Sequence, residues 1–283
     1  MKMTNPKSNT YVTKRSGERV PFDPERLKRS LQRVGAGEED VAAILKEVEG
    51  MLYEGIPTSR IYRKAHELLR RRSSGASARY HLKQAIQELG PTGYPFEKYV
   101  GALLAYQGYE VRNDQLLEGK CVQHEVDVVA EKGDEVIMVE CKFHSEQGTK
   151  SDVKVPMYIH SRFEDLRSNL EHYYPGRKMR FRGWVVTNTR FTEDAIAFGR
   201  CNGLYLISWD YPEQGSLRDR IDLAGLHPVT CLHSLTRKEK KELLQREVVL
   251  VKELLDDPAL LESLHLTGTR RKKLLQEARE LFY

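Results

Sequence analysis

Hydrophobic positions divide the chain into a helical N-terminal zone, a central zone of valine-rich strands and a helical C-terminal zone. Near the N-terminus, apolar side chains recur every three or four positions, as at Leu27, Leu31 and Val34, which is typical of one face of an amphipathic helix. A strand, a turn at Ser16-Gly17 and a second strand precede this pattern. The predicted elements are a strand pair over 11–22 and helices over 24–35, 38–55 and 58–72. These elements form a small α+β domain.

The central zone begins near residue 91, where the run Gly90-Pro91-Thr92-Gly93 interrupts the helical pattern. Strands rich in valine alternate with amphipathic segments from there to about residue 211, which predicts an α/β domain. The predicted turn between two of its strands is Lys132-Gly133-Asp134. The predicted helices span 96–108, 153–174 and 192–203, and the predicted strands span 109–113, 120–133, 135–143, 181–188 and 204–209.

The C-terminal zone, 212–283, is predicted to be helical and basic. Residues 235–255 have the pattern of one long amphipathic helix, and residues 257–282 predict two shorter helices joined at Thr267-Gly268. The last pair faintly resembles a helix-hairpin-helix, a motif that holds DNA phosphates through backbone amides at a glycine turn. Arg270, Arg271 and Lys272 follow that turn and are the candidate DNA-binding residues of this zone. A helical packing or dimerisation unit is an equally good interpretation.

Composition narrows the class of protein. No apolar run approaches the roughly 20 residues of a membrane span, and residues 1–17 lack the apolar core of a secretory signal, so we expect a cytoplasmic protein with no membrane partner. The four cysteines are widely spaced, which argues against a zinc ribbon or a disulfide framework. A formal net charge of +5 is compatible with a phosphate-rich partner, although lysine and arginine also serve simply to solvate helix faces.

Candidate chemistry lies on two predicted strands of the central zone. Asp127 is on one, and Glu140 and Lys142 share one face of the next, because side chains alternate with a period of two. Pairing the strands as a hairpin brings Asp127 alongside Glu140. Two neighbouring carboxylates form an oxygen site for Mg²⁺ or Mn²⁺, and a lysine beside them can orient or deprotonate water. The surrounding valines indicate buried strands, where unpaired charges are costly unless they serve a site.

At this point the central zone resembles the Mrr-like branch of the PD-(D/E)xK nucleases. The matching pieces, in order, are GYPFEKYVGALLAYQGYEV, VDVV, VECK and TNTRFTEDAIAFGRCNGLYLISW. The resemblance implies that Asp127, Glu140 and Lys142 are catalytic and that Asp127 and Glu140 bind the metal. Glu97, on the opening helix, matches a position that often assists the metal site, although a solvated helix glutamate is the alternative.

The sequence departs from the family's pattern just before the first aspartate. Relatives often have a glycine-rich approach there, whereas this chain has Gln123-His124-Glu125-Val126. We interpret His124 and Glu125 as surface strand residues, and contact with the site or with DNA is the alternative. The helix that follows the E-x-K segment carries Arg162, which we predict to contact DNA.

The N-terminal zone resembles the ATP-cone, a nucleotide-sensing module. The resemblance rests on YVTKRSGERVPFDPERL and continues through GIPTSRI and ARYHL. It implies that Lys14, Arg15 and Arg26 contact phosphates, that Val12 lines the base pocket and that Thr58 hydrogen-bonds nearby. Because the chain has no P-loop, we expect ATP or dATP to act as an effector rather than a fuel. A cone that keeps only the fold is the alternative.

Together these observations predict an α/β multidomain protein. Its parts are a small α+β ATP-cone (11–90), a restriction-endonuclease-like α/β core with a mixed central sheet (91–211) and C-terminal helices (212–283). The predicted function is a metal-dependent DNA endonuclease controlled by a nucleoside triphosphate, with homo-oligomerisation left open. One alternative is a nucleotide-responsive DNA-binding regulator whose nuclease fold is inactive, and another is a nucleotide-dependent assembly module.

Overall fold

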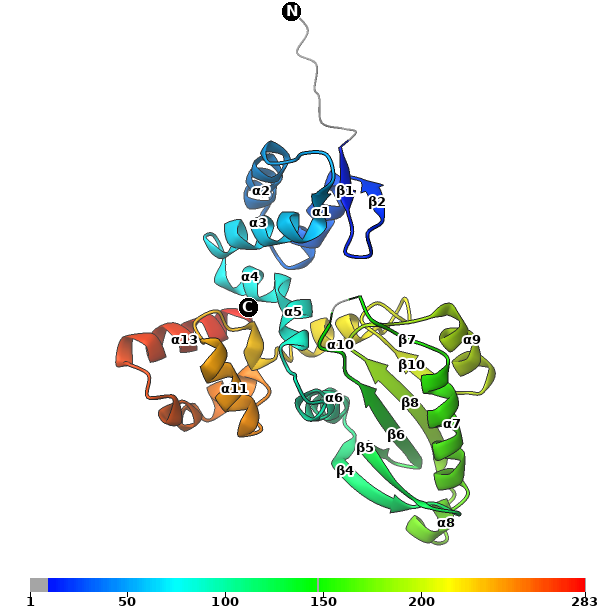
Figure 1. The fold of residues 1–283 in the computed structure, drawn as a ribbon. Helices are drawn as coiled ribbons and strands as arrows, with labels where there is room; N and C mark the ends of the chain where they lie inside the picture. Colours follow the sequence, from blue (N-terminus) through cyan, green and yellow to red (C-terminus); the bar gives the residue numbers. More distant parts are fainter. Residues whose placement is uncertain (1–9, 147, 283) are drawn as a thin grey trace, which may run out of the picture. The chain divides into compact units, whose positions relative to one another are not determined.

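The computed structural model describes residues 10–146 and 148–282, which fall into two compact units (Figure 1). The first unit combines the N-terminal residues up to Leu82 with Cys231–Thr236 and the residues from Asp257 onward. The second unit contains Lys83–Thr230 and Arg237–Asp256. The chain therefore passes from one unit to the other four times. Among the described residues, no helix is both long and apolar enough to cross a membrane.

The first unit has a small sheet packed against helices. The sheet has the order β2-β1-β3, and β1 pairs antiparallel with β2 and parallel with β3. Asp23 begins the first helix because its carboxylate accepts a hydrogen bond from the Arg26 amide, 3.0 Å away, and Pro24 fits the first turn. The core is formed by the apolar faces that the sequence pattern predicted. The elements are β1 (Tyr11–Thr13), β2 (Arg19–Pro21), α1 (Pro24–Arg33), α2 (Glu38–Gly50), β3 (Ile56–Pro57), α3 (Thr58–Arg70) and α4 (Ser74–Tyr80).

Residues from near the C-terminus complete the first unit. A 3-10 helix, η2 (Pro258–Leu264), is followed by α13 (Gly268–Glu280), which packs against α4. The approach is so close that a Cβ atom at Gly75 would lie 2.2 Å from the Glu280 carbonyl oxygen. Arg79 donates to the same carbonyl at 3.4 Å. Glycine at position 75 is thus required for the contact between α4 and α13.

The second unit is built on a five-stranded mixed sheet of order β10-β8-β6-β5-β4. The first three strands in sequence pair antiparallel, and β6, β8 and β10 are parallel. The strands are β4 (Glu110–Glu118), β5 (Gln123–Lys132), β6 (Glu135–Lys142), β8 (Arg180–Thr187) and β10 (Tyr205–Ile207), and a separate short pair joins β7 (Lys150–Ser151) to β9 (Arg190–Phe191). The predicted mixed central sheet is confirmed.

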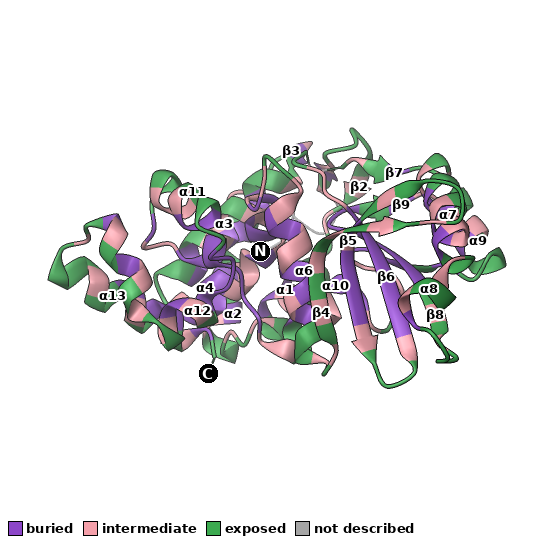
Figure 2. Cartoon of the chain, turned by 90° about the horizontal axis from the view of Figure 1, so that it is seen from below, coloured by how far each residue is buried: buried purple, intermediate pink, exposed green. Residues whose placement is uncertain are grey.

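Helices cover both faces of this sheet, so the middle of β6 and the adjoining parts of β5 and β8 are buried, whereas the far ends of β5 and β8 are exposed (Figure 2). Val185 belongs to a core cluster with residues of α7 and α9, whereas its neighbours Trp184 and Val186 line a small cavity together with residues of α6 and α10. The helices of this unit are α5 (Leu82–Gln87), α6 (Tyr94–Tyr106), α7 (Lys154–Arg167), α8 (Leu170–Tyr173), α9 (Glu193–Cys201), α10 (Leu217–Ala224), η1 (Val229–Cys231), α11 (Arg237–Gln245) and α12 (Val251–Asp256). η1 and α5 each include one residue assigned to the first unit.

Two long predicted helices are wrong as single elements. The one expected over 235–255 is divided into α11 and α12, because Glu247 has φ of 64° and Leu250 bridges to Pro228 in an extended conformation. The one expected over 153–174 is divided at Ser168-Asn169 into α7 and α8. The apolar periodicity continues across both breaks. The helices end because the backbone conformation changes there, and the apolar pattern does not encode that change.

Candidate active site and nucleotide cavity

The three predicted catalytic residues lie together where the pairing between β5 and β6 ends. The last paired residues of the two strands are Val128 and Val139, and Asp127 and Glu140 are the next residue on each. Asp127 Oδ2 accepts a hydrogen bond from the Cys141 amide at 2.6 Å. Lys142 Nζ donates to Glu140 Oε1 at 2.5 Å. Asp127, Glu140 and Lys142 are therefore brought together, as the hairpin argument predicted.

Glu140 is paired on both of its oxygens. Its side chain is 6% exposed, and besides Lys142 it binds Arg162, whose guanidinium donates to Glu140 Oε2 at 2.8 Å. Arg162 also donates to the carbonyl oxygen of Glu125. The predicted contact of Arg162 with DNA remains a prediction, and in this structure its guanidinium is committed to the carboxylate cluster. Sequence spacing gives no sign of this pairing, because Arg162 comes from another element.

Burial and neighbouring negative charges raise the pKa values of Asp127 and Glu97. Burial, and then the neighbouring Glu140 charge, raises the pKa of Asp127 to about 6, and the Cys141 amide, Lys142 and Arg162 only partly offset this. Glu97, in the first turn of α6, is half-buried, and burial followed by the charge of Asp127 raises its pKa to about 7. The cluster therefore has more negative charge than its two cations stabilise.

The donor set suits a hard divalent cation, since oxygen ligands and excess negative charge are what such an ion needs. Within 10–146 and 148–282, however, no group of three or more His, Cys, Asp or Glu side chains is arranged to hold a metal ion. The arrangement is thus a carboxylate pair with Glu97 nearby rather than a preformed cage. Mg²⁺ is commonly held by one or two carboxylates together with water and substrate phosphate, so the chemistry of the site fits.

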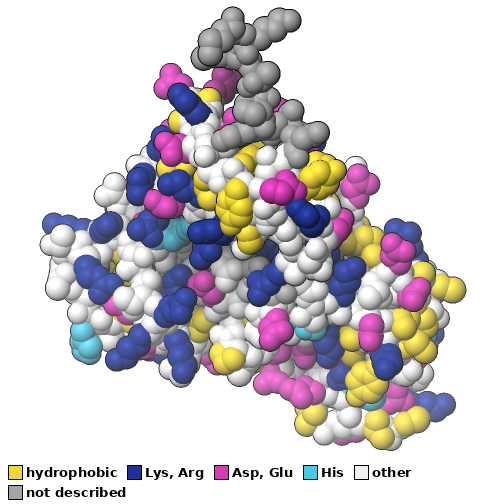
Figure 3. Space-filling model, turned by 45° about the horizontal axis from the view of Figure 1, so that its top comes forward, with side chains coloured by type: hydrophobic (Ala, Val, Ile, Leu, Met, Phe, Trp, Pro, Cys, Tyr) yellow, Lys and Arg dark blue, Asp and Glu magenta, His cyan; other side chains and the backbone are white. Residues whose placement is uncertain are grey.

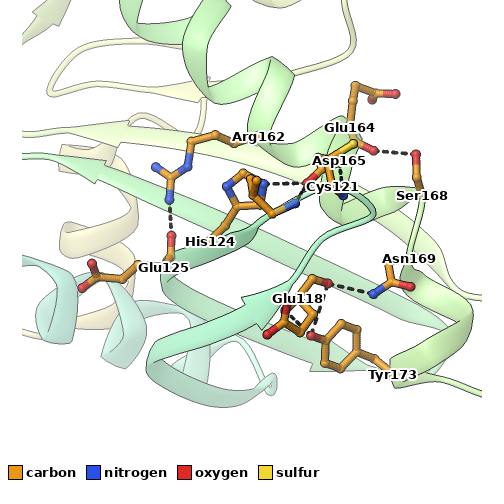
Figure 4. A network of polar contacts seen from close by, with 11 residues as sticks. Glu118, Cys121, His124, Glu125, Arg162, Glu164, Asp165, Ser168, Asn169 and Tyr173 are labelled. Atoms are coloured by element: carbon orange, nitrogen blue, oxygen red, sulfur yellow. Dashed lines mark hydrogen bonds and ion pairs between the residues drawn. The ribbon is translucent and has the colours of Figure 1, made fainter.

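A clasp between α7 and the β4–β5 hairpin positions Arg162 (Figure 4). His124 Nε2 lies 2.8 Å from Asp165 Oδ2, and the Cys121 amide donates to Asp165 Oδ1 at 2.9 Å. The hydrogen bond from His124 is the main reason that the pKa of Asp165 falls to about 2. His124 is only 11% exposed, so it is a packing residue of this clasp and not the surface residue we predicted. Asp165 lies three residues after Arg162 and fixes the same turn of α7.

Other polar residues support the cluster and were missed in the sequence. The Asn113 amide donates to the Glu97 carbonyl at 3.2 Å, which ties β4 to α6. Thr187, fully buried, donates to the Lys142 carbonyl at 2.7 Å. Asn188 brackets His144 through two 2.8 Å hydrogen bonds to its backbone. The sequence feature that could have indicated them is the pair Thr187-Asn188 at the end of a buried strand, because buried polar residues need hydrogen-bond partners.

The first unit contains a cavity of about 310 Å³ between β1, β2, α1, α3 and α4. Four of the five residues predicted to bind nucleotide line it, namely Val12, Lys14, Arg26 and Thr58. Arg15 is outside the lining. A volume of this size is at the lower end for small-molecule sites, and the wall combines cations with apolar groups as nucleotide sites do. The assignments of individual residues to nucleotide contacts remain predictions.

Two tyrosines in this cavity were missed in the sequence. Tyr62 and Tyr80 line the cavity, and their rings stack with centroids 5.0 Å apart and planes 12° apart. Burial raises the pKa of Tyr80 to about 12, so it is a neutral phenol at any physiological pH. A pair of stacked rings in a cavity wall offers a flat surface to a nucleobase. The two residues are 18 positions apart, which no periodic pattern reveals.

The basic residues of α13 are partly engaged in the structure. Arg270 donates to the Ser234 carbonyl at 3.0 Å and Arg271 to the Pro258 carbonyl at 2.8 Å, whereas Lys272 is exposed. Thr267 caps α13 by accepting from the Arg270 amide. On the face shown in Figure 3, acidic side chains lie between many of the basic ones. DNA binding by Arg270, Arg271 and Lys272 remains a prediction.

Comparison with family models identifies the class of each part. Residues 10–83 match the ATP cone domain, residues 90–211 match a restriction endonuclease domain, and residues 227–282 match the family described as AF1548-like, C-terminal. The resemblances seen in the sequence are thus confirmed: an ATP-cone domain is joined to a restriction-endonuclease-like domain with a mixed sheet. The third match was not predicted.

Individual relatives are less informative about function. An uncharacterized protein of Archaeoglobus fulgidus is 29% identical over 180 residues, which are 63% of this chain and 97% of that protein. The crystal structure of the protein of unknown function AF1548 has a TM-score of 0.55 at 29% identity and covers 67% of this chain and 98% of that one. MspJI restriction endonuclease in complex with a 27-mer oligonucleotide has a TM-score of 0.35 at 14% identity, and the match covers 61% of this chain and 36% of that chain. This likeness is too slight to support an argument.

Proposed function

We propose that this chain is a metal-dependent DNA endonuclease whose activity responds to ATP or dATP bound in the cavity of the cone. The observation that carries the proposal is the meeting of Asp127, Glu140 and Lys142 where the pairing between β5 and β6 ends. Glu140 is buried and Asp127 and Lys142 are partly buried, and charges removed from water are costly unless they serve a site. Their setting in a restriction-endonuclease-like domain supports the hydrolysis of a phosphodiester bond.

The residues have distinct roles in this proposal. Asp127 and Glu140 would hold a divalent cation, which when bound supplies positive charge at the scissile phosphate and acidifies water. Lys142 holds a proton at Nζ beside Glu140 and orients the attacking water or the phosphate. Arg162 fixes Glu140 through Oε2 and neutralises part of its charge. The valine-rich strands exclude water from behind the cluster, so these charges act in a medium of low dielectric constant.

The test is cleavage of supercoiled plasmid and of single-stranded DNA with Mg²⁺ or Mn²⁺, with and without ATP or dATP. Lys142→Ala is the informative variant. Lys132→Ala is its matched control, since Lys132 is an exposed lysine of β5 that donates to the Gln107 carbonyl, away from the cluster. Cutting by the wild type and the control but not by Lys142→Ala supports the proposal, and equal cutting by all three contradicts it.

A second candidate, a nucleotide-responsive DNA-binding regulator that does not cut, is favoured by one observation. Both oxygens of Glu140 are already paired with Lys142 and Arg162, and a carboxylate paired in this way is neutralised without a metal ion. This candidate predicts DNA binding without cleavage in any metal. Calorimetry with Mn²⁺ separates the two, because a regulator of this kind has no need to bind the ion at Asp127.

A further inference from the structure

A cluster of rings leads away from the nucleotide cavity inside the first unit. It begins with the stacked Tyr62 and Tyr80 of the cavity wall. His66 lies parallel to Tyr62, with centroids 6.1 Å apart, and stacks on His81 at 4.9 Å. His233 then packs against His66 with centroids 4.9 Å apart. These five residues are the ring cluster.

Hydrogen-bonding groups join the rings as well as packing. His66 Nε2 and His233 Nε2 are 3.3 Å apart, and Ser77 Oγ also lies 3.3 Å from His233 Nε2. The Tyr62 hydroxyl lies 3.4 Å from His81 Nδ1. A ligand that moves Tyr62 or Tyr80 therefore changes what surrounds His233, because close-packed interiors transmit small displacements rather than absorb them.

His233 belongs to a six-residue segment with an unusual position in the chain. The segment Cys231–Thr236, which we call the strap, is part of the first unit, whereas Thr230 before it and Arg237 after it are part of the second. Within the first unit, Glu277 of α13 accepts hydrogen bonds from the amides of His233 at 2.6 Å and Ser234 at 2.9 Å. The middle of the strap is thus held in the unit that contains the nucleotide cavity.

The residue before the strap is held in the second unit. Thr230 is fully buried, and its hydroxyl donates to the Ala85 carbonyl at 2.6 Å. Lys240 of α11 donates to the Thr230 carbonyl at 2.5 Å and to Glu88 at 3.2 Å. A change in the strap is consequently passed along a short covalent segment to a fixed, buried point of the nuclease-like unit.

We infer that the ring cluster and the strap couple occupancy of the nucleotide cavity to the nuclease-like unit, and that His233 is the residue through which the coupling passes. This rests on the proposed function for the binding of nucleotide and for cleavage. By thermodynamic reciprocity, DNA must change the affinity for ATP by the same factor as ATP changes the affinity for DNA. In this inference, the effect of ATP on DNA binding and the effect of DNA on ATP binding both pass through the strap.

The test uses the full chain and compares His233→Ala with wild type. Calorimetry measures the ATP affinity with and without a DNA duplex in the absence of metal, and hydrogen exchange follows the amides of 231–236. In the wild type, we expect ATP to alter exchange in the strap and DNA to change the ATP affinity by about fivefold or more. In His233→Ala, the ATP affinity without DNA stays within about threefold, and the effect of DNA falls below about twofold.

Controls keep the outcome interpretable. His172→Ala changes an exposed histidine of α8 in the second unit and should behave as wild type. His233→Gln removes the ring but keeps a hydrogen-bonding group, and it replaces the alanine variant if thermal unfolding shows the latter to be unfolded. Coupling that persists in a folded His233 variant overturns the inference, as does bound ATP that leaves exchange in the strap unchanged. Absence of ATP binding to the wild type contradicts the proposed nucleotide control itself, and the inference with it.

Discussion

The two candidate sites of this molecule differ in how their charges are satisfied. In the carboxylate cluster, Glu140 is paired on both oxygens with Lys142 and Arg162, and Asp127 accepts a hydrogen bond from a backbone amide. In the cone, a cavity of about 310 Å³ is lined by cationic and aromatic side chains. The first site must exchange partners to admit a ligand, whereas the second has room for one. The type of ligand that a site can bind and the room it has for that ligand are therefore separate properties, and each can be tested alone.

The largest effect is expected from Asp127→Asn. The substitution keeps an oxygen that can accept from the Cys141 amide but removes the charge that a cation requires. Cleavage should fall by roughly 10³-fold or more, in the range of losses seen on removing a group that acts in the chemical step. Mn²⁺ binding measured by calorimetry should also be lost, and ATP binding should be unaffected. Unchanged Mn²⁺ affinity would mean that the ion, if needed, binds elsewhere.

Next comes Arg162→Ala, which breaks a buried ion pair and leaves Glu140 with only Lys142. We expect the free energy of unfolding to fall by about 2 kcal/mol, because the buried Glu140 carboxylate loses one of its two charged partners. Denaturant unfolding measures it. Arg167→Ala is the control, since Arg167 pairs with Glu164 on the exposed side of the same helix and should cost at most about 1 kcal/mol. Equal losses in the two variants would refute the buried role of Arg162.

Arg26→Ala probes the open cavity. Losing one charge-assisted hydrogen bond to a phosphate should weaken ATP binding by about 2 kcal/mol, or roughly 30-fold. Arg29→Ala, at an exposed position of the same helix that lies near Asp23 and outside the cavity lining, should leave the affinity within about twofold. Titration calorimetry decides between them. If both variants bind ATP like wild type, the phosphates do not lie along α1.

The last prediction concerns the acid stability of the first unit. Burial and the neighbouring His81 and His233, with Arg70, lower the pKa of His66 from 6.5 to about 3. Between pH 6.5 and 3, His66 is protonated in the unfolded chain but neutral in the folded chain. The free energy of unfolding therefore falls as the pH is lowered through this range. Thermal unfolding from pH 7 to pH 4 should show a shallower decline in His66→Gln than in wild type. A parallel decline in both would show that other groups dominate.

Regular patterns explain why the cluster was predictable and the rest was not. Strand alternation and a tight turn place Glu140, Lys142 and Asp127 together, because all three lie within one hairpin. The pairing of Arg162 with Glu140 and the stacking of Tyr62 on Tyr80 depend on how separate elements pack. Resemblance to known families supplied the cone residues Val12, Lys14, Arg26 and Thr58, which line the cavity.

The contact between α4 and α13 also bears on how the protein can be made and divided. Residues 10–82 are synthesised first, yet the partner that covers Gly75 and receives hydrogen bonds from Arg79 is made only after the entire five-stranded sheet. During synthesis, the N-terminal part of the first unit therefore has part of its surface uncovered until α13 has been made. A fragment cut at residue 90 would lack α13 and the strap, so an isolated cone is the wrong reagent for measuring what this cavity binds.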